Sequence, residues 1–130
     1  MRLLLDTHFI LWWLAGSSKL GAPARRLIGS ADCAASTASF VEMRMKCAKG
    51  KLSLPGVAQL QAQLDAERIQ VLALTPAHVD AGARFEQTVA DPMDRLLLGT
   101  AAVEGRVLLT RDAVLLALAD RASLKFVREG

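Results

Sequence analysis

The segment Arg2-Leu3-Leu4-Leu5-Asp6 carries the main signal for the fold of this chain. Three consecutive leucines form a short apolar run, which is typical of a strand that is buried on both of its faces. Strands of this kind belong to parallel sheets that are covered by helices on both sides. The run stops at Asp6, so the sequence predicts a carboxylate at the C-terminal end of a buried strand.

The rest of the chain alternates short apolar runs with helix signals. Thr75-Pro76 and Asp91-Pro92 each place a capping residue before a proline, which is a typical helix start, and no hairpin dipeptide joins two apolar runs. We therefore expect an α/β fold, with a parallel sheet of about four to five short strands flanked by helices on both faces. Strands are expected over 2–5, 32–35, 69–74, 107–109 and 125–127. One helix is expected after Asp6, and another is expected to begin within 36–39 and end at Gly50. Further helices are expected over 23–28, 57–68, 76–87, 92–104 and 113–120.

Composition limits the class of protein. The chain has 130 residues, of which 52% are hydrophobic, so it is too apolar to be disordered and has the size of a single domain spanning 1–130. Its 2 cysteines exclude a disulfide scaffold and favour a cytoplasmic location. No apolar run approaches the roughly 18 residues of a membrane span or resembles a signal peptide, so no membrane association is expected. The net charge of +3 fits a polyanionic partner without requiring one.

Four carboxylates are expected at one edge of the sheet. Asp6 and Asp112 follow strands, Glu42 lies early in the helix after the second strand, and Asp94 lies in the first turn of the helix before the 107–109 strand. Open α/β sheets bind ligands at the C-terminal ends of their strands, where all four would lie. Any one of them alone could be a simple helix cap, and Ser39 with Glu42 matches the spacing of a capping box.

Convergence of these carboxylates would require a cation. Two carboxylates about 4 Å apart repel by roughly 4 kcal/mol at an effective dielectric near 20, so such a cluster must bind a cation or take up protons. Only hard oxygen ligands are available, which favours Mg²⁺ or Mn²⁺ over zinc. Metal sites of this type catalyse phosphoryl transfer and phosphodiester hydrolysis, and the mild positive charge makes a nucleic acid the candidate substrate.

Four segments together resemble the PIN-domain ribonucleases of the VapC toxin type. They occur in the same order over nearly the whole chain: Leu3-Leu4-Leu5-Asp6-Thr7-His8 with Trp12-Trp13, Ser36-Thr37-Ala38-Ser39-Phe40-Val41-Glu42 with Lys46 and Gly50-Lys51-Leu52, Asp91-Pro92-Met93-Asp94-Arg95-Leu96-Leu97, and Leu109-Thr110-Arg111-Asp112. Members often carry a His before the Asp-Pro element and an aromatic residue after it, where this chain has Val89, Ala90 and Met93. Gly99 stands where an Ala is expected, which predicts a slightly looser helix.

The resemblance implies a single PIN-like nuclease domain that acts as a metal-dependent endoribonuclease, the toxin of a toxin–antitoxin pair. It implies that Asp6, Glu42, Asp94 and Asp112 form an acidic quartet that holds Mg²⁺ or Mn²⁺, with Thr110 beside it. An RNA substrate, a cytosolic antitoxin partner and a homodimer are also implied.

Several neighbouring residues have two interpretations. Asp91 is an N-cap that could also touch the metal, and Arg95 is either an ion-pair partner or a phosphate contact. Lys46 is expected to pair with Glu42. His8 follows Asp6 by two residues and could approach the site, but a structural role is expected for it. Two adjacent tryptophans cannot both point inward from one helix, so Trp12 or Trp13 is predicted to line an exposed apolar groove for an antitoxin helix.

Two rival classes of function stay open at this point, a phosphotransfer domain and a non-enzymatic module. A phosphatase would need a second Asp where this chain has His8, and a receiver-like domain would need a Lys where it has Asp112, so both are disfavoured. A catalytically inactive, metal-binding PIN-like interaction module would keep the same fold and partner. Only an assay separates that module from an enzyme, and the sequence does not indicate which RNA would be cut.

Overall fold

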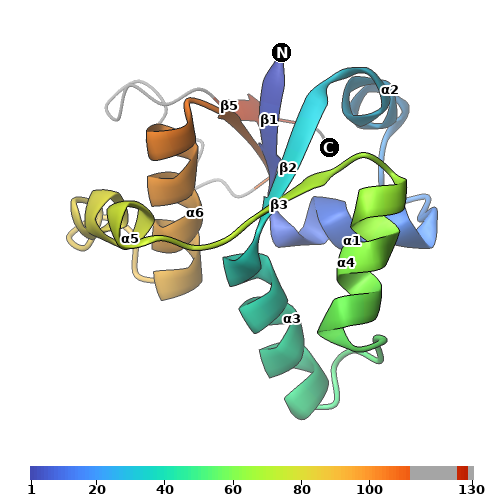
Figure 1. Ribbon diagram of the computed structural model, residues 1–130, viewed down its shortest axis with the longest axis horizontal. Coiled ribbons are helices and arrows are strands. Elements are labelled where there is room, and N and C mark those ends of the chain that lie inside the picture. The colour runs from blue at the N-terminus through green and yellow to red at the C-terminus, as the bar shows by residue number, and fades with distance from the viewer. Residues whose placement is uncertain (112–125, 129–130) are drawn as a thin grey trace.

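The core of the fold is a parallel sheet in which β1 is the central strand (Figure 1). The computed structural model describes residues 1–111 and 126–128. Within them five strands lie in the order β3-β2-β1-β4-β5, and every neighbouring pair is parallel. The strands are β1 (Arg2–Leu5), β2 (Asp32–Ser36), β3 (Gln70–Leu72), β4 (Val107–Thr110) and β5 (Phe126–Arg128).

The leucine run occupies the middle of this sheet. Leu4 pairs with Ala34 of β2 on one side and with Leu108 of β4 on the other. Leu3, Leu4 and Leu5 are completely buried. The short apolar run is therefore a strand covered on both faces, as its composition predicts.

Helices cover both faces of the sheet. Leu3 and Leu5 belong to one hydrophobic cluster, with Phe9 and Met43, whereas Leu4 belongs to a second cluster on the opposite face. Figure 1 shows α5 and α6 on one side of the sheet and α1 to α4 on the other, which confirms the expected fold class. The helices in the described residues are α1 (Thr7–Ala15), α2 (Ala22–Ser30), α3 (Thr37–Ala48), α4 (Val57–Ala66), α5 (Pro76–Ala83) and α6 (Pro92–Glu104).

Helix α3 begins earlier than the capping-box spacing predicts. Its N-cap is Ser36, whose Oγ accepts a hydrogen bond from the Ala38 backbone N–H at 3.0 Å. Ser39 lies inside the helix and accepts a hydrogen bond from the Thr7 hydroxyl at 2.9 Å. The proposed capping box of Ser39 with Glu42 is therefore wrong, and the Glu42 side chain is not used in a cap.

Helices α5 and α6 pack with their backbones in close contact. A Cβ atom on Gly99 would collide with the His78 carbonyl oxygen, and one on Gly82 would collide with the Arg95 carbonyl oxygen. The expectation that Gly99 only loosens its helix is thus incomplete, because its missing side chain lets α6 approach α5. Helix α5 ends at Ala83, four residues before the expected end at 87.

The third strand is shorter than expected, because it ends at Leu72 rather than at residue 74. The Leu74 backbone N–H donates to the Thr37 hydroxyl at 2.9 Å, so it bonds to the start of α3 instead of to a neighbouring strand. The expected helix over 113–120 and the candidate residue Asp112 lie outside the described residues.

Candidate active site

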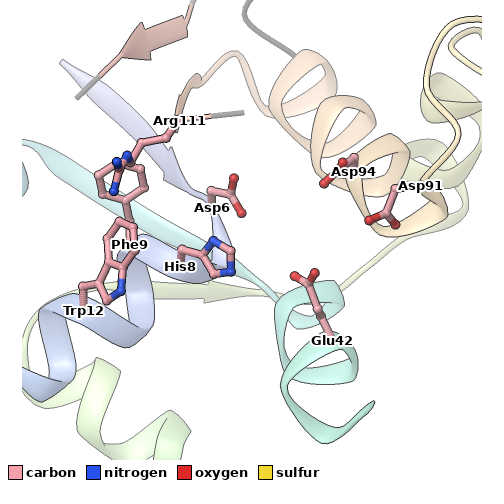
Figure 2. A pocket seen from close by; sticks show the side chains of 8 residues that line it. All are labelled: Asp6, His8, Phe9, Trp12, Glu42, Asp91, Asp94 and Arg111. Carbon is pink, nitrogen blue, oxygen red and sulfur yellow. The ribbon is translucent and has the colours of Figure 1, made fainter. Parts of the chain in front are cut away.

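One cavity opens at the C-terminal edge of the sheet and contains most of the candidate residues (Figure 2). Its volume is about 420 Å³. Asp6 follows β1 and Arg111 follows β4, and because these strands are parallel neighbours their C-terminal ends meet there. The lining residues are Asp6, His8, Phe9, Trp12, Glu42, Asp91, Asp94 and Arg111.

Asp6 is held by the neighbouring strand. The Thr110 hydroxyl donates a hydrogen bond of 2.7 Å to Asp6 Oδ2, and the Asp6 backbone N–H donates to the Leu109 carbonyl at 3.1 Å. Burial raises the pKa of Asp6 above its ordinary value, and the charge of Glu42 adds to the rise. The Thr110 hydrogen bond acts in the opposite direction but does not outweigh burial, so Asp6 is costly to ionise without a nearby cation.

Two further carboxylates belong to the start of α6. Asp91 is its N-cap, and Asp91 Oδ1 accepts a hydrogen bond of 2.8 Å from the Met93 backbone N–H. Asp94 lies in the first helical turn. The N-cap interpretation of Asp91 is correct, and the same residue also lines the cavity.

The carboxylates enter the cavity from three separate elements. Figure 2 shows Asp6 at the end of β1, Glu42 on α3, and Asp94 at the start of α6, with their side chains directed into the same space. Within residues 1–111 and 126–128, no three Asp, Glu, His or Cys side chains are grouped closely enough to hold a metal ion. The donors are hard oxygens, which fit Mg²⁺ or Mn²⁺ in their chemistry.

The structure places His8 at the cavity, which is the alternative that the sequence leaves open beside a structural role. His8 is exposed and stacks on Trp12 with a centroid separation of 5.6 Å and an interplanar angle of 24°. Lys46 Nζ lies 3.0 Å from His8 Nε2, and no ion pair between Lys46 and Glu42 occurs among the described residues. The spacing of four residues between His8 and Trp12 on a helix is a signal that could have placed them on one face.

Comparison with known proteins assigns the chain to a family. The family model of the PIN domain matches residues 3–121. This chain belongs to the PIN domain family. Ribonuclease VapC22 of Mycobacterium tuberculosis is 32% identical to this PIN domain over 113 residues, which cover 84% of this chain and 85% of the relative.

Solved structures share the fold of this PIN domain at lower identity. The VapBC2 structure from Rickettsia felis, bound to a promoter DNA fragment, matches with a TM-score of 0.65 at 17% identity and covers 100% of both chains. The FitAcB structure from Neisseria gonorrhoeae matches with a TM-score of 0.62 at 22% identity, over 97% of this chain and 96% of that chain. Among the described residues, no helix of the PIN domain is long and apolar enough to cross a membrane.

Arg95 has a structural role in this PIN domain. One of its guanidinium nitrogens donates to the carbonyl oxygens of Val89 at 2.8 Å and Ala90 at 3.2 Å. Arg95 therefore holds the segment that leads into α6, where Asp91 and Asp94 lie. It forms no ion pair within the described part of the chain and does not line the cavity.

The two tryptophans of the PIN domain lie in different places. Both are partly buried against the hydrophobic cluster of Leu3 and Leu5. Trp12 lines the acidic cavity, whereas Trp13 lines a separate cavity of about 320 Å³. The exposed apolar groove expected along residues 9–14 stays a prediction. A separate apolar hollow lies on α3 and α4, lined by Phe40, Val41, Arg44, Met45, Ala48 and Val57.

Proposed function

We propose that this PIN domain, spanning 1–130, is a metal-dependent endoribonuclease and the toxin of a toxin–antitoxin pair, which hydrolyses RNA phosphodiester bonds. The observation that carries the proposal is the presence of Asp6, Glu42 and Asp94, from three different elements, in one cavity at the C-terminal edge of the sheet. Membership of the PIN family and the 32% identity to a ribonuclease support it.

In this proposal Asp6, Glu42, Asp94 and Asp112 hold Mg²⁺ or Mn²⁺. The bound ion would neutralise charge on the scissile phosphate and acidify the attacking water. The Thr110 hydroxyl orients the Asp6 carboxylate through its 2.7 Å hydrogen bond. Asp91 is an accessory residue that adds negative charge to the cavity, and Arg95 is an accessory residue that positions the start of α6.

A carboxylate of the protein would also accept the proton that the attacking water loses. A water that attacks the phosphorus must lose a proton as the new P–O bond forms, and a carboxylate within reach can accept it. Asp94 or Glu42 takes this role in our proposal, since both line the cavity while Asp6 already accepts the Thr110 hydrogen bond. Cleavage then breaks the bond from phosphorus to the leaving oxygen of the RNA strand, which takes up a proton from solvent water.

The direct test is to incubate the purified full chain with total RNA, with and without Mg²⁺, and to map the new RNA ends. We expect cleavage that requires the metal and is lost in Asp94→Asn. Asp65→Asn is the matched control, because Asp65 is exposed on α4 outside the cavity. Equal cleavage without Mg²⁺, or full activity in Asp94→Asn, would reject the proposed mechanism.

The inactive-module alternative predicts a different combination of results. Mn²⁺ would raise the melting temperature of the wild type, but no RNA in the total pool would be cut. Such an outcome would favour a metal-binding PIN-like interaction module over an enzyme.

The proposed partner is an antitoxin protein, and the proposed assembly is a cytoplasmic homodimer bound to it. Trp12 and Trp13 stay the predicted antitoxin contacts, while the apolar hollow on α3 and α4 offers a second surface. Co-purification with the product of the neighbouring small open reading frame should weaken in Trp12→Ala or Trp13→Ala and not in Met45→Ala. The reverse pattern would move the contact to α3. Light scattering of the isolated chain tests the dimer.

A further inference from the structure

The acidic cavity has a second wall of different chemistry, which contains His8, Trp12 and Arg111. Lys46 contacts His8, and we call these four residues the aromatic wall. Figure 2 shows His8, Trp12 and Arg111 across the cavity from Asp91 and Asp94. The Arg111 guanidinium carbon lies 5.2 Å from the centroid of the Trp12 ring, within cation–π distance. The carboxylates and this wall therefore face the same space.

The His8 ring is held in place by two contacts. It stacks on Trp12, and Lys46 Nζ lies 3.0 Å from its Nε2 atom. A lysine ammonium group can only donate hydrogen bonds, so Nε2 is the acceptor in this contact. His8 is nevertheless exposed. The wall thus offers a fixed aromatic ring to a ligand in the cavity.

The two cations of the wall, Lys46 and Arg111, have N–H groups that can bind a ligand. Lys46 uses one of its three N–H groups on His8, and Arg111 forms no ion pair with any residue that the structure describes. They lie beside a cavity that contains four carboxylates, which repel a phosphate chain. A polyanion that enters this cavity needs cationic contacts at its edge.

We propose that the aromatic wall is the subsite for one unpaired nucleotide that flanks the scissile phosphate. Its base stacks on His8, and its phosphate contacts Lys46 and Arg111. The inference rests on the proposed function for the position of the scissile phosphate at the carboxylates. The base must be unpaired, because a base inside a duplex cannot present its face to a side chain. A cavity of about 420 Å³ has the size of a small-ligand site.

The test is the affinity of the full chain for a fluorescein-labelled single-stranded RNA of mixed sequence, measured by fluorescence anisotropy in EDTA so that no metal-dependent cleavage occurs. Stacking on aromatic side chains contributes enough that His8→Ala should raise the dissociation constant about tenfold. His8→Phe keeps a stacking ring and should restore most of the affinity. A blunt RNA duplex should bind more weakly than the single strand.

A matched pair of lysine variants tests the proposed contacts with phosphate. Lys46→Gln keeps an N–H donor for His8 but removes the charge, so the slope of log affinity against log salt should fall by about one phosphate contact. Lys49→Gln removes the same charge from an exposed lysine beyond the end of α3 and should leave the slope unchanged. Wild-type affinity in His8→Ala, or equal weakening in His8→Ala and His8→Phe, would overturn the subsite.

Failure of this inference is distinguishable from failure of the proposed function. If the wild type cuts RNA but His8→Ala binds RNA as tightly as the wild type, the subsite is wrong and the nuclease proposal stands. If binding depends on His8 but no RNA is cut in Mg²⁺, the aromatic wall binds a nucleotide without a scissile phosphate beside it, and the nuclease proposal is wrong.

Discussion

At the scale of single residues, Asp6 shows how two physical effects compete in this site. It terminates a strand that is buried on both faces, and the resulting desolvation raises the pKa of its carboxyl group. Thr110 partly compensates by donating a hydrogen bond of 2.7 Å. Ionised Asp6 is therefore a destabilising group in the folded protein unless a cation lies near it, which suits a metal ligand and not a purely structural residue.

Replacing Asp6 should change stability in a pH-dependent way. Because the folded-state pKa lies above the ordinary value of 3.8, the folded protein binds this proton more tightly than the unfolded chain does. Stability from Asp6 is thus fully present below pH 3.8 and is lost as the pH rises through the folded-state pKa. Asp6→Asn should be more stable than the wild type at pH 7 in EDTA, and the gain should vanish near pH 3. Urea midpoints at the two pH values measure it.

The same variant should lose RNA cleavage by about 100-fold or more, because it removes a carboxylate that we propose as a metal ligand. Asp65→Asn provides the control, since Asp65 is exposed on α4 and should show neither effect. An Asp6→Asn protein that is less stable than the wild type at pH 7 would contradict the desolvation argument.

Thr110 should act on the pKa of Asp6. Thr110→Val removes the hydroxyl that donates to Asp6 Oδ2, so the pKa of Asp6 should rise further and the acid limb of the pH–rate profile should move to higher pH. Thr100→Val is the matched control: it deletes a buried hydroxyl that donates to the Leu96 carbonyl in α6. Both variants should lose about 1 kcal/mol of stability. Carboxyl-carbon NMR titration should show a shifted Asp6 only in Thr110→Val.

At the scale of elements, the packing of α5 on α6 decides where two carboxylates lie. Gly82 and Gly99 let the backbones of these helices touch, and Arg95 holds the segment before α6 through carbonyl hydrogen bonds. The start of α6 is thereby held over the edge of the sheet, with Asp91 and Asp94 at the cavity. A residue far from the cavity can consequently control the geometry of the site.

Gly99→Ala should therefore be destabilising although alanine is the better helix former. Its Cβ would meet the backbone of His78 and Gly82, and such overpacking costs about 1–3 kcal/mol. Gly29→Ala is the control in α2, where the added Cβ would make only an ordinary contact of 3.9 Å with Trp13. It should stabilise the protein by about 0.5–1 kcal/mol. Thermal denaturation of both variants distinguishes them, and a stabilised Gly99→Ala would contradict the close packing.

At the scale of the whole molecule, the carboxylates of the cavity have the opposite sign to the net charge of the chain. The chain carries a net charge of +3, yet the cavity at the sheet edge contains the four carboxylates Asp6, Glu42, Asp91 and Asp94. Local negative charge in a positive molecule favours a cation at the site, while the rest of the surface can attract a polyanion. This combination suits an RNA substrate whose cleavage needs a divalent metal.

Divalent metal should stabilise the fold by mass action. At a Mn²⁺ concentration about 100 times the dissociation constant, binding to the folded state alone adds roughly 2.7 kcal/mol, which corresponds to a rise of several degrees in the melting temperature. The rise should be absent from the Asp6→Asn/Asp94→Asn double variant. A melting temperature of the wild type that does not respond to millimolar Mn²⁺ would count against the metal site.

The sequence by itself determined the fold class and most of the carboxylates of the cavity. The reason is that its signals are local: a leucine run ending in Asp6, and cap-then-proline pairs that start α5 and α6. Because the strands are parallel, a residue that follows a strand must lie at one common edge of the sheet. Asp6, Glu42 and Asp94 could therefore be placed together without knowledge of any contact, whereas Asp112 lies outside the described residues.

The tertiary structure alone decided which side chains contact one another across the sheet edge. Lys46 is one helical turn from Glu42 but contacts His8, because α1 and α3 converge there and place the ring within 3.0 Å of Nζ. The need for glycine at position 99 depends likewise on the distance between the backbones of α5 and α6. The placement of Trp12 and Trp13 at different cavities also depends on how the elements pack. Local patterns carry no information about such distances, since packing between elements sets them.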